Sequence, residues 1–295
     1  MIILKKKVFL NDEKTFTVFV YCFLSILVII CLYPFLNVLA YSLSSNGAIL
    51  SGNVTLYPME LQFESYKNIL SRSTIGNALI VSVIVTLFGT LLGIAITICA
   101  AYALYKKRLK GRKFLSGFIL FTMYFSGGVI PTFLVVKNLG ILDTNFSLIL
   151  PSAMSCFYFI IMRSFFQQLP QSLEEAATLD GCNDLSYLIK IALPLSLPII
   201  ATISLFYAVG YWNDYFASLM YISSPEKFPM QLLLRQLIFT EALNQIGTAE
   251  GMAQAVMPES LKAASVVITI IPIIVVYPWL QKYFVKGVML GSVKG

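Results

Sequence analysis

Long uncharged, apolar segments alternate with short charged ones along this chain. Six runs without a charged residue are long enough to cross a bilayer, which takes about 20 mostly apolar residues: 15–59, 73–105, 114–136, 144–162, 191–213 and 263–281. The first run turns polar from Ser44 onward, so its helix is expected near 15–43. The runs are apolar on every side, which favours helices over the alternating strands of a β-barrel. The sequence therefore predicts an all-α polytopic membrane protein with six transmembrane helices.

The composition excludes several classes of protein. The 295 residues are 58% hydrophobic and 12% charged, whereas soluble domains are roughly 45–50% apolar and about 25% charged. A water-soluble enzyme and a disordered chain are both excluded. The absence of histidine removes Ser-His-Asp and Cys-His catalysis as well as His-ligated metals. The five cysteines are scattered without a CxxC pair and predict neither disulfides nor a metal site.

The distribution of Lys and Arg orients the chain. Six crossings place both termini on one side, and a cytoplasmic N-terminus puts 15 basic residues inside against 6 outside. This predicts a cytoplasmic segment 1–14, a membrane domain 15–284 and a cytoplasmic tail 285–295. The net charge of +7 follows from this topology, so no nucleic-acid partner is expected. The basic cluster 106–113 is interpreted as an anchor beside anionic membrane lipid.

The predicted cytoplasmic loop 167–193 is locally acidic. Ser172 and Glu175 have the spacing of a capping box, which predicts a helix starting at Leu173. Gly181 stands where a left-handed residue ends such a helix, and Asn183 or Asp184 opens a second one. So short a helix is marginal alone. From spacing alone, docking to a cytoplasmic partner and a self-capped surface helix are equally supported.

The same loop carries a family resemblance. Glu175-Ala176-Ala177-x-x-Asp180-Gly181, followed by Ile191-x-Leu193-Pro194, resembles the EAA motif of ABC-importer permeases. Residues 126–131, 139–144, Trp212-Asn213-Asp214 and the C-terminal tail resemble the carbohydrate-uptake branch, in particular the second permease of maltose-type systems and Gram-positive permeases for complex oligosaccharides. Cys182 departs from the family, which often has alanine there.

The resemblance implies a mechanism and partners. The chain would be no enzyme and would bind no cofactor, since it has no G-x-x-x-x-G-K-[ST] loop. ATP and Mg would sit on a cytoplasmic ATP-binding subunit dimer, coupled through Glu174, Glu175, Ala176, Ala177, Asp180 and Gly181. A second homologous permease and an extracellular sugar-binding protein, which the outer loop 221–262 would face, complete an importer of the bacterial plasma membrane that works by alternating access.

The candidate substrate pathway has two parts, both open to a structural interpretation. Asp214 would accept sugar hydroxyls with Tyr211 or Trp212 stacking on the sugar, or it would cap a neighbouring loop, which the sequence favours. Polar and glycine residues interrupt the third run. The pathway candidates are Tyr124, Gly127, Gly128, Tyr211, Trp212, Asn213 and Asp214. The Gly89-x-x-x-Gly93 pattern predicts a helix–helix contact.

Three other functions are possible for a sequence of this kind. A permease for a different small solute, such as an amino acid or phosphate, shares the coupling loop. A secondary transporter would carry inverted repeats and mid-membrane carboxylates, which the sequence lacks. A membrane scaffold without transport activity would not need the EAA-like loop.

Overall fold

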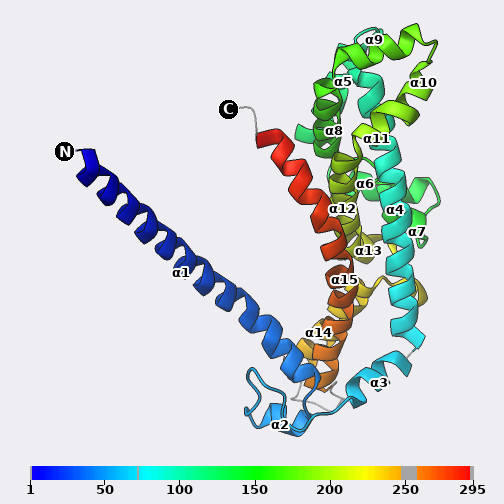
Figure 1. Ribbon diagram of the computed structural model, residues 1–295. Helices are drawn as coiled ribbons and strands as arrows, with labels where there is room; N and C mark the ends of the chain where they lie inside the picture. The colour runs from blue at the N-terminus through cyan, green and yellow to red at the C-terminus, as the bar shows by residue number, and fades with distance from the viewer. Residues whose placement is uncertain (1, 72, 247–257, 293–295) are drawn as a thin grey trace. The chain divides into compact units, whose positions relative to one another are not determined.

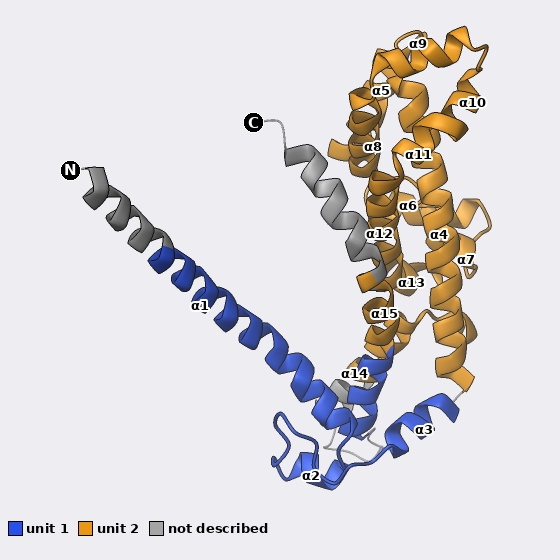
Figure 2. Cartoon of the chain, viewed as in Figure 1, with its two compact units in different colours: residues 1–71, 240–268 blue, residues 72–239, 269–295 orange. Residues whose placement is uncertain are grey.

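The computed structural model describes residues 2–71, 73–246 and 258–292, and these contain helices and no strand (Figure 1). Residues 247–257 of the predicted outer loop and residues 293–295 of the predicted tail lie outside the described residues. The chain divides into two compact units, 1–71 with 240–268 and 72–239 with 269–295 (Figure 2).

Three helices are long and apolar enough to cross a membrane by themselves. The first is residues Lys14–Ser42 of α1 (Ile2–Ser42), so the helix also includes residues 2–13 of the predicted cytoplasmic segment. The second is α4 (Ser73–Tyr105), and the third begins α15 (Glu259–Ser292). Their positions match the first, second and sixth predicted runs.

Two further candidate spans are bent pairs of helices. The direction of the chain bends by 116° between α5 (Arg112–Tyr124) and α6 (Val129–Asn138). The segment Asp184–Leu195, made of α10 (Asp184–Tyr187), η1 (Leu188–Ala192) and α11 (Leu193–Leu195), meets α12 (Leu197–Asn213) at 82°. The described residues thus hold three to five candidate spans, and six remains a prediction.

The fourth predicted run, 144–162, is divided. α7 (Asn145–Ile149) and α8 (Cys156–Gln168) lie on either side of Pro151. Proline has no N–H and its ring clashes with the preceding turn, which explains the break. α8 has 13 residues and extends about 20 Å, short of the ~30 Å hydrocarbon core.

The first unit is held together by serine and amide hydrogen bonds. Ser45 caps α2 (Asn46–Leu50) by accepting from the N–H of Ala48 at 3.1 Å. The side chain of Asn46 accepts from the N–H of Glu259 at 3.1 Å, and the hydroxyl of Ser65 on α3 (Glu64–Ser71) donates to that of Ser260. These bonds tie α2 and α3 to the start of α15.

The core of the second unit lies among α4, α8 and α12. Ala101, Phe159, Met162 and Ile203 are completely buried there. The predicted contact of the glycine pair is confirmed: a Cβ on Gly89 would lie 2.6 Å from the ring of Tyr211, and one on Gly93 would lie 2.9 Å from that of Tyr207. The glycines therefore let α12 approach α4 closely.

The carboxylate of Asp143 joins two loops of the second unit by contacts with Ser223, Ser224 and Lys227, which together form the Asp143 clip. Asp143, in the left-handed region at φ 55°, follows α6. Its Oδ1 accepts from the N–H groups of Ser223 (3.0 Å) and Ser224 (2.9 Å), and its Oδ2 lies 2.9 Å from Lys227 Nζ. These contacts fix the segment between α13 (Phe216–Tyr221) and η2 (Pro225–Lys227), ahead of α14 (Met230–Ile246).

Candidate functional site

The predicted coupling helix exists as α9 (Gln171–Leu179), but it begins two residues earlier than the capping box predicts. Its N-terminal cap is Pro170, and no side chain caps it, so the capping-box prediction was wrong. Pro170 has a helix-compatible φ of −58° and no N–H to satisfy, and it opens the helix directly. Ser172 then lies inside the first turn.

The end of α9 agrees with the sequence. Gly181 adopts φ +77°, the predicted left-handed conformation. The N–H of Cys182 donates to the carbonyl of Ala177 at 2.8 Å, and that of Gly181 donates to Thr178 at 3.1 Å. This is a Schellman ending. Asn183 then caps α10 by accepting from the N–H of Ser186 at 2.8 Å, as predicted.

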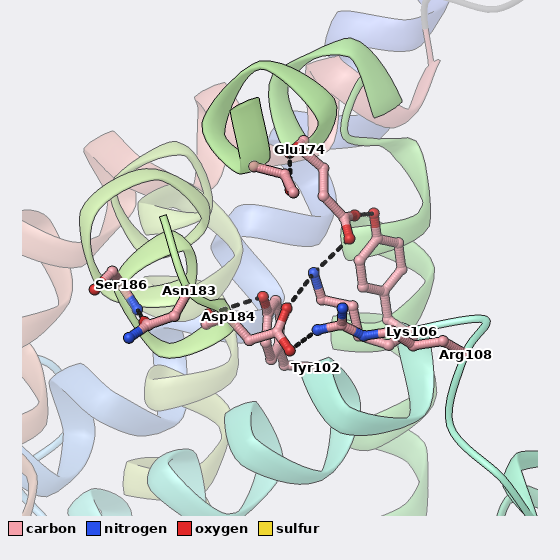
Figure 3. Close-up of polar contacts among 9 residues, drawn as sticks. Tyr102, Lys106, Arg108, Glu174, Asn183, Asp184 and Ser186 are labelled. Carbon is pink, nitrogen blue, oxygen red and sulfur yellow. Dashed lines mark hydrogen bonds and ion pairs between the residues drawn. The ribbon is translucent and has the colours of Figure 1, made fainter. Parts of the chain in front are cut away.

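The inner side of α9 is fixed to the end of α4 by a buried lysine. Lys106 is only 8% exposed, and its Nζ lies 2.6 Å from Oε1 of Glu174 on α9 and 3.3 Å from Oδ1 of Asp184 on α10 (Figure 3). Tyr105 donates to the other oxygen of Glu174 at 2.9 Å, and Arg108 pairs with Asp184. One cation thereby joins three helices.

Aromatic rings surround the same ammonium. Nζ of Lys106 lies 4.8 Å from the ring centre of Tyr102 and 4.9 Å from that of Tyr187. Both are cation–π distances. The hydroxyl of Tyr102 also donates to the backbone carbonyl of Asp184 at 3.0 Å. The ammonium of Lys106 is therefore enclosed by protein groups. This differs from the interpretation of the cluster 106–113 as an anchor beside membrane lipid.

The two partners have shifted pKa values. Burial lowers the pKa of Lys106, but hydrogen bonds to Glu174 and Tyr102 outweigh it, and the pKa is raised overall. Burial raises the pKa of Glu174, but hydrogen bonds from Lys106 and Tyr105 outweigh it and leave the pKa below its ordinary value. Both groups are charged at neutral pH.

The predicted coupling residues divide between two sides of the loop. Glu174 contacts Lys106, and Ala177 is buried at 6% exposure. Glu175, Ala176, Asp180 and Gly181 are exposed.

Three large apolar side chains in the same stretch are also exposed. Leu179 is 89%, Leu185 64% and Ile189 55% exposed. A groove of about 500 Å³ borders Glu174, Glu175 and Leu179 on one side and residues 105–108 on the other. The outer side of the loop thus combines carboxylates with apolar side chains that are exposed among the described residues.

The first part of the predicted pathway lies at the bend between α5 and α6. Tyr124 is 78% exposed and ends α5, and Gly128 adopts φ +86° immediately before α6. Gly127 lies between them. The predicted interruption of the third run is confirmed as a break in the helix, whereas a role in transport remains a prediction.

The second part lies at the end of α12. Tyr211 donates to the carbonyl of Ile149 at 3.1 Å, and Trp212 is buried, with its Nε1 3.3 Å from the carbonyl of Thr269. Oδ1 of Asp214 accepts from the N–H of Ala217 in the first turn of α13 at 3.1 Å, and the choice between a sugar contact and a structural role for Asp214 remains a prediction. Asn213 is exposed.

A recess of about 240 Å³ between α8 and α12 brings two predicted residues together. Tyr211 and Asp214 line it, whereas Trp212, Asn213 and the residues of the α5–α6 bend do not. Sequence reasoning missed Lys106 and Tyr158, which also lines the recess. The position of Lys106 directly after an uncharged run was the available signal for the lysine.

The geometry defines a helical protein with three to five candidate membrane spans among the described residues and an exposed surface loop at α9. The chain belongs to the binding-protein-dependent transport system inner membrane component family, whose model matches residues 89–290. It is 45% identical, over 96% of this chain and 99% of the relative, to a polygalacturonan/rhamnogalacturonan transport system permease protein, YtcP, of Bacillus subtilis.

Two more comparisons agree. Protein LplC of Bacillus subtilis is 45% identical over 90% of both chains. A chain of a bacterial ABC transporter involved in the import of the acidic polysaccharide alginate has a TM-score of 0.83 and 34% identity, over 92% of this chain and 98% of that one.

Proposed function

We propose that this chain is a transmembrane permease subunit of an ATP-driven importer that moves a sugar or oligosaccharide into a bacterial cell. The family membership gives the class of transport system, and the carbohydrate names of the relatives support the substrate class. Six helices cross the plasma membrane with both termini in the cytoplasm, residues 15–284 forming the membrane domain. The excess of Lys and Arg in the inner segments supports this orientation.

The loop 167–193 docks to a cytoplasmic ATPase dimer, which holds ATP and Mg. The observation that carries this assignment is the two-sided character of α9. Its inner side is fixed by the Lys106–Glu174 ion pair, while Glu175, Leu179 and Asp180 are exposed. A short helix held on one side and bare on the other suits a groove with apolar walls and cations.

Transport proceeds by alternating access. Closure of the ATPase dimer displaces the docked loops of this chain and of a second homologous permease. The cavity between the two permeases then changes from inward-facing to outward-facing. An extracellular binding protein delivers the sugar to the outer loop 221–262. Hydrolysis takes place on the ATPase subunit, and this chain transmits the movement.

The test uses the purified transporter in liposomes, with ATP hydrolysis and sugar uptake measured together. Glu175→Lys places a cation on the exposed side of α9, and uptake per ATP is expected to fall at least tenfold. Glu64→Lys, a matched charge reversal at an exposed site in α3, is the control. Normal uptake by the Glu175→Lys transporter would remove the coupling role from this loop.

A further inference from the structure

The recess between α8 and α12 has the size of a single sugar ring. Its volume of about 240 Å³ is below the ~300–1,000 Å³ of pockets that enclose drug-sized ligands. It is also roughly eight times the ~30 Å³ that one water occupies in the liquid. A monosaccharide unit fits this space, whereas a whole oligosaccharide would extend beyond it.

The walls of the recess are aromatic and fixed. The hydroxyl of Tyr207 is bonded to Thr97 at 2.8 Å and accepts from the N–H of Ser155 at 3.0 Å. Tyr211 is held through its bond to Ile149. The ring of Tyr158 packs edge-on against Tyr207, with centres 4.7 Å apart. Tyr207 and Tyr211 are buried against α4, so the half-buried ring of Tyr158, stacked on Phe206 at 5.7 Å, is the one that presents apolar surface suited to the C–H face of a pyranose.

Polar groups of the recess remain available for a ligand. Oδ1 of Asp214 accepts from the N–H of Ala217, and within the described residues its Oδ2 has no hydrogen-bond partner. The hydroxyl of Tyr158 likewise has no hydrogen-bond partner in that part of the chain. A carboxylate accepts from sugar hydroxyls in charge-assisted bonds, and a phenol both donates and accepts. These groups complement the edge of a sugar ring.

The charge of the recess selects among sugars. Among the residues that line the recess, Asp214 is the one carboxylic acid, and there is no Lys or Arg. Arg235, which stacks on the ring of the adjacent Tyr215 at 4.6 Å, is not among the lining residues. A uronate carboxylate placed beside Asp214 would be repelled, and the repulsion is strongest where water is scarce. A neutral ring carries no such penalty.

From these observations we infer that the α8–α12 recess is a binding subsite for one uncharged pyranose ring. The ring stacks on Tyr158, and its hydroxyls donate to Oδ2 of Asp214. The inference rests on the proposed function and deepens it. Where a transported oligosaccharide contains both uronate and neutral units, this subsite takes a neutral one.

The experiment compares two trisaccharides that differ only at C6, α-1,4-linked galactotriose and trigalacturonate. Equilibrium binding is measured on the full transporter in nanodiscs. Galactotriose is expected to bind at least tenfold more tightly.

Asp214→Asn keeps the Oδ1 acceptor for Ala217 but removes the charge, so it is expected to abolish this preference. Tyr158→Leu is expected to weaken galactotriose binding about tenfold. Glu64→Gln, at an exposed site on α3 outside the recess, is the matched control and is expected to retain wild-type binding.

Two outcomes overturn the inference: a wild-type complex that binds trigalacturonate as tightly as galactotriose or binds neither, and an Asp214→Asn complex that keeps the wild-type preference. Co-purification with the partner subunits verifies that each variant is assembled. ATP-dependent sugar uptake by the wild-type complex separately tests the proposed function. Binding preference without ATP-driven uptake overturns that function alone, and ATP-driven uptake without the preference overturns the subsite alone.

Discussion

The ammonium of Lys106 lies 2.6 Å from the carboxylate of Glu174, so the residue that follows α4 forms an ion pair directly with α9. The two residues are separated by 68 positions in the sequence. Because the lysine is 8% exposed, the contact is shielded from solvent on the side of the lysine. This ion pair is the connection between α9 and the membrane domain that can be tested most directly.

Replacing Lys106 by Met is expected to uncouple ATP hydrolysis from uptake and to destabilise the subunit. The substitution leaves the Glu174 carboxylate without its cation, and an unmatched charged hydrogen-bond partner costs about 1–3 kcal/mol. Thermal unfolding of the purified subunit measures the second effect. Lys110→Met, at an exposed lysine, is the control. Equal melting temperatures for the two variants would contradict the structural role of the ion pair.

The strength of the contact between α9 and the end of α4 is expected to depend on pH in a defined direction. The pKa of Glu174 is lowered, so its stabilisation is complete above about pH 4.3 and is lost as the pH falls through the lower, folded-state pKa. The pKa of Lys106 is raised, so its stabilisation is complete below about pH 10.4 and is lost as the pH rises through the folded-state pKa.

Hydrogen exchange of the α9 amides checks this dependence. Wild type is expected to be better protected than Glu174→Gln at neutral pH, and the difference is expected to shrink in acid. A difference that persists unchanged at pH 2 would show that the carboxylate charge does not hold the helix.

Gly89→Ala is expected to destabilise the packing of α4 on α12. The added Cβ would lie 2.6 Å from the ring of Tyr211, and crowding a packed core typically costs about 1–3 kcal/mol. Gly76→Ala in the same helix meets nothing within 4 Å and serves as the matched control. Unfolding in detergent should separate the two variants, and equal stability would argue against the close approach.

Asp143→Ala is expected to release the segment 222–227 and expose it to proteases. The carboxylate accepts hydrogen bonds from Ser223, Ser224 and Lys227, and these hold the pKa of Asp143 well below its usual range. The clip is therefore expected to persist in mildly acidic buffer. Limited proteolysis measures the release, with Asp143→Asn as the milder variant because an amide oxygen still accepts. Identical cleavage of wild type and Asp143→Ala would exclude the clip.

The sequence predicted features that depend on neighbours along the chain. The left-handed Gly181, the cap at Asn183 and the interruption near Gly128 each follow from local backbone preferences. The glycine pair at Gly89 and Gly93 was also predictable, because small residues at this spacing form a smooth face.

Features that depend on distant residues were not predictable in this way. The start of α9 was misplaced because Pro170 and the Ser172–Glu175 pair are competing local signals, and the proline decides. The burial of Lys106 follows from Tyr102, Tyr187 and two carboxylates on other helices. The recess likewise requires α8 to meet α12, and no pattern in either segment records that meeting.

The unbroken length of α4 has a mechanical consequence. The helix contains no proline and joins Lys106 at one end to Gly89, which touches Tyr211 in the wall of the recess. Seventeen residues of helix span about 26 Å, and sharp kinks occur where such a rod is interrupted. Under the proposed function, a displacement of α9 is therefore expected to be transmitted along α4 to Tyr211, so that the proposed docking loop and the recess move together.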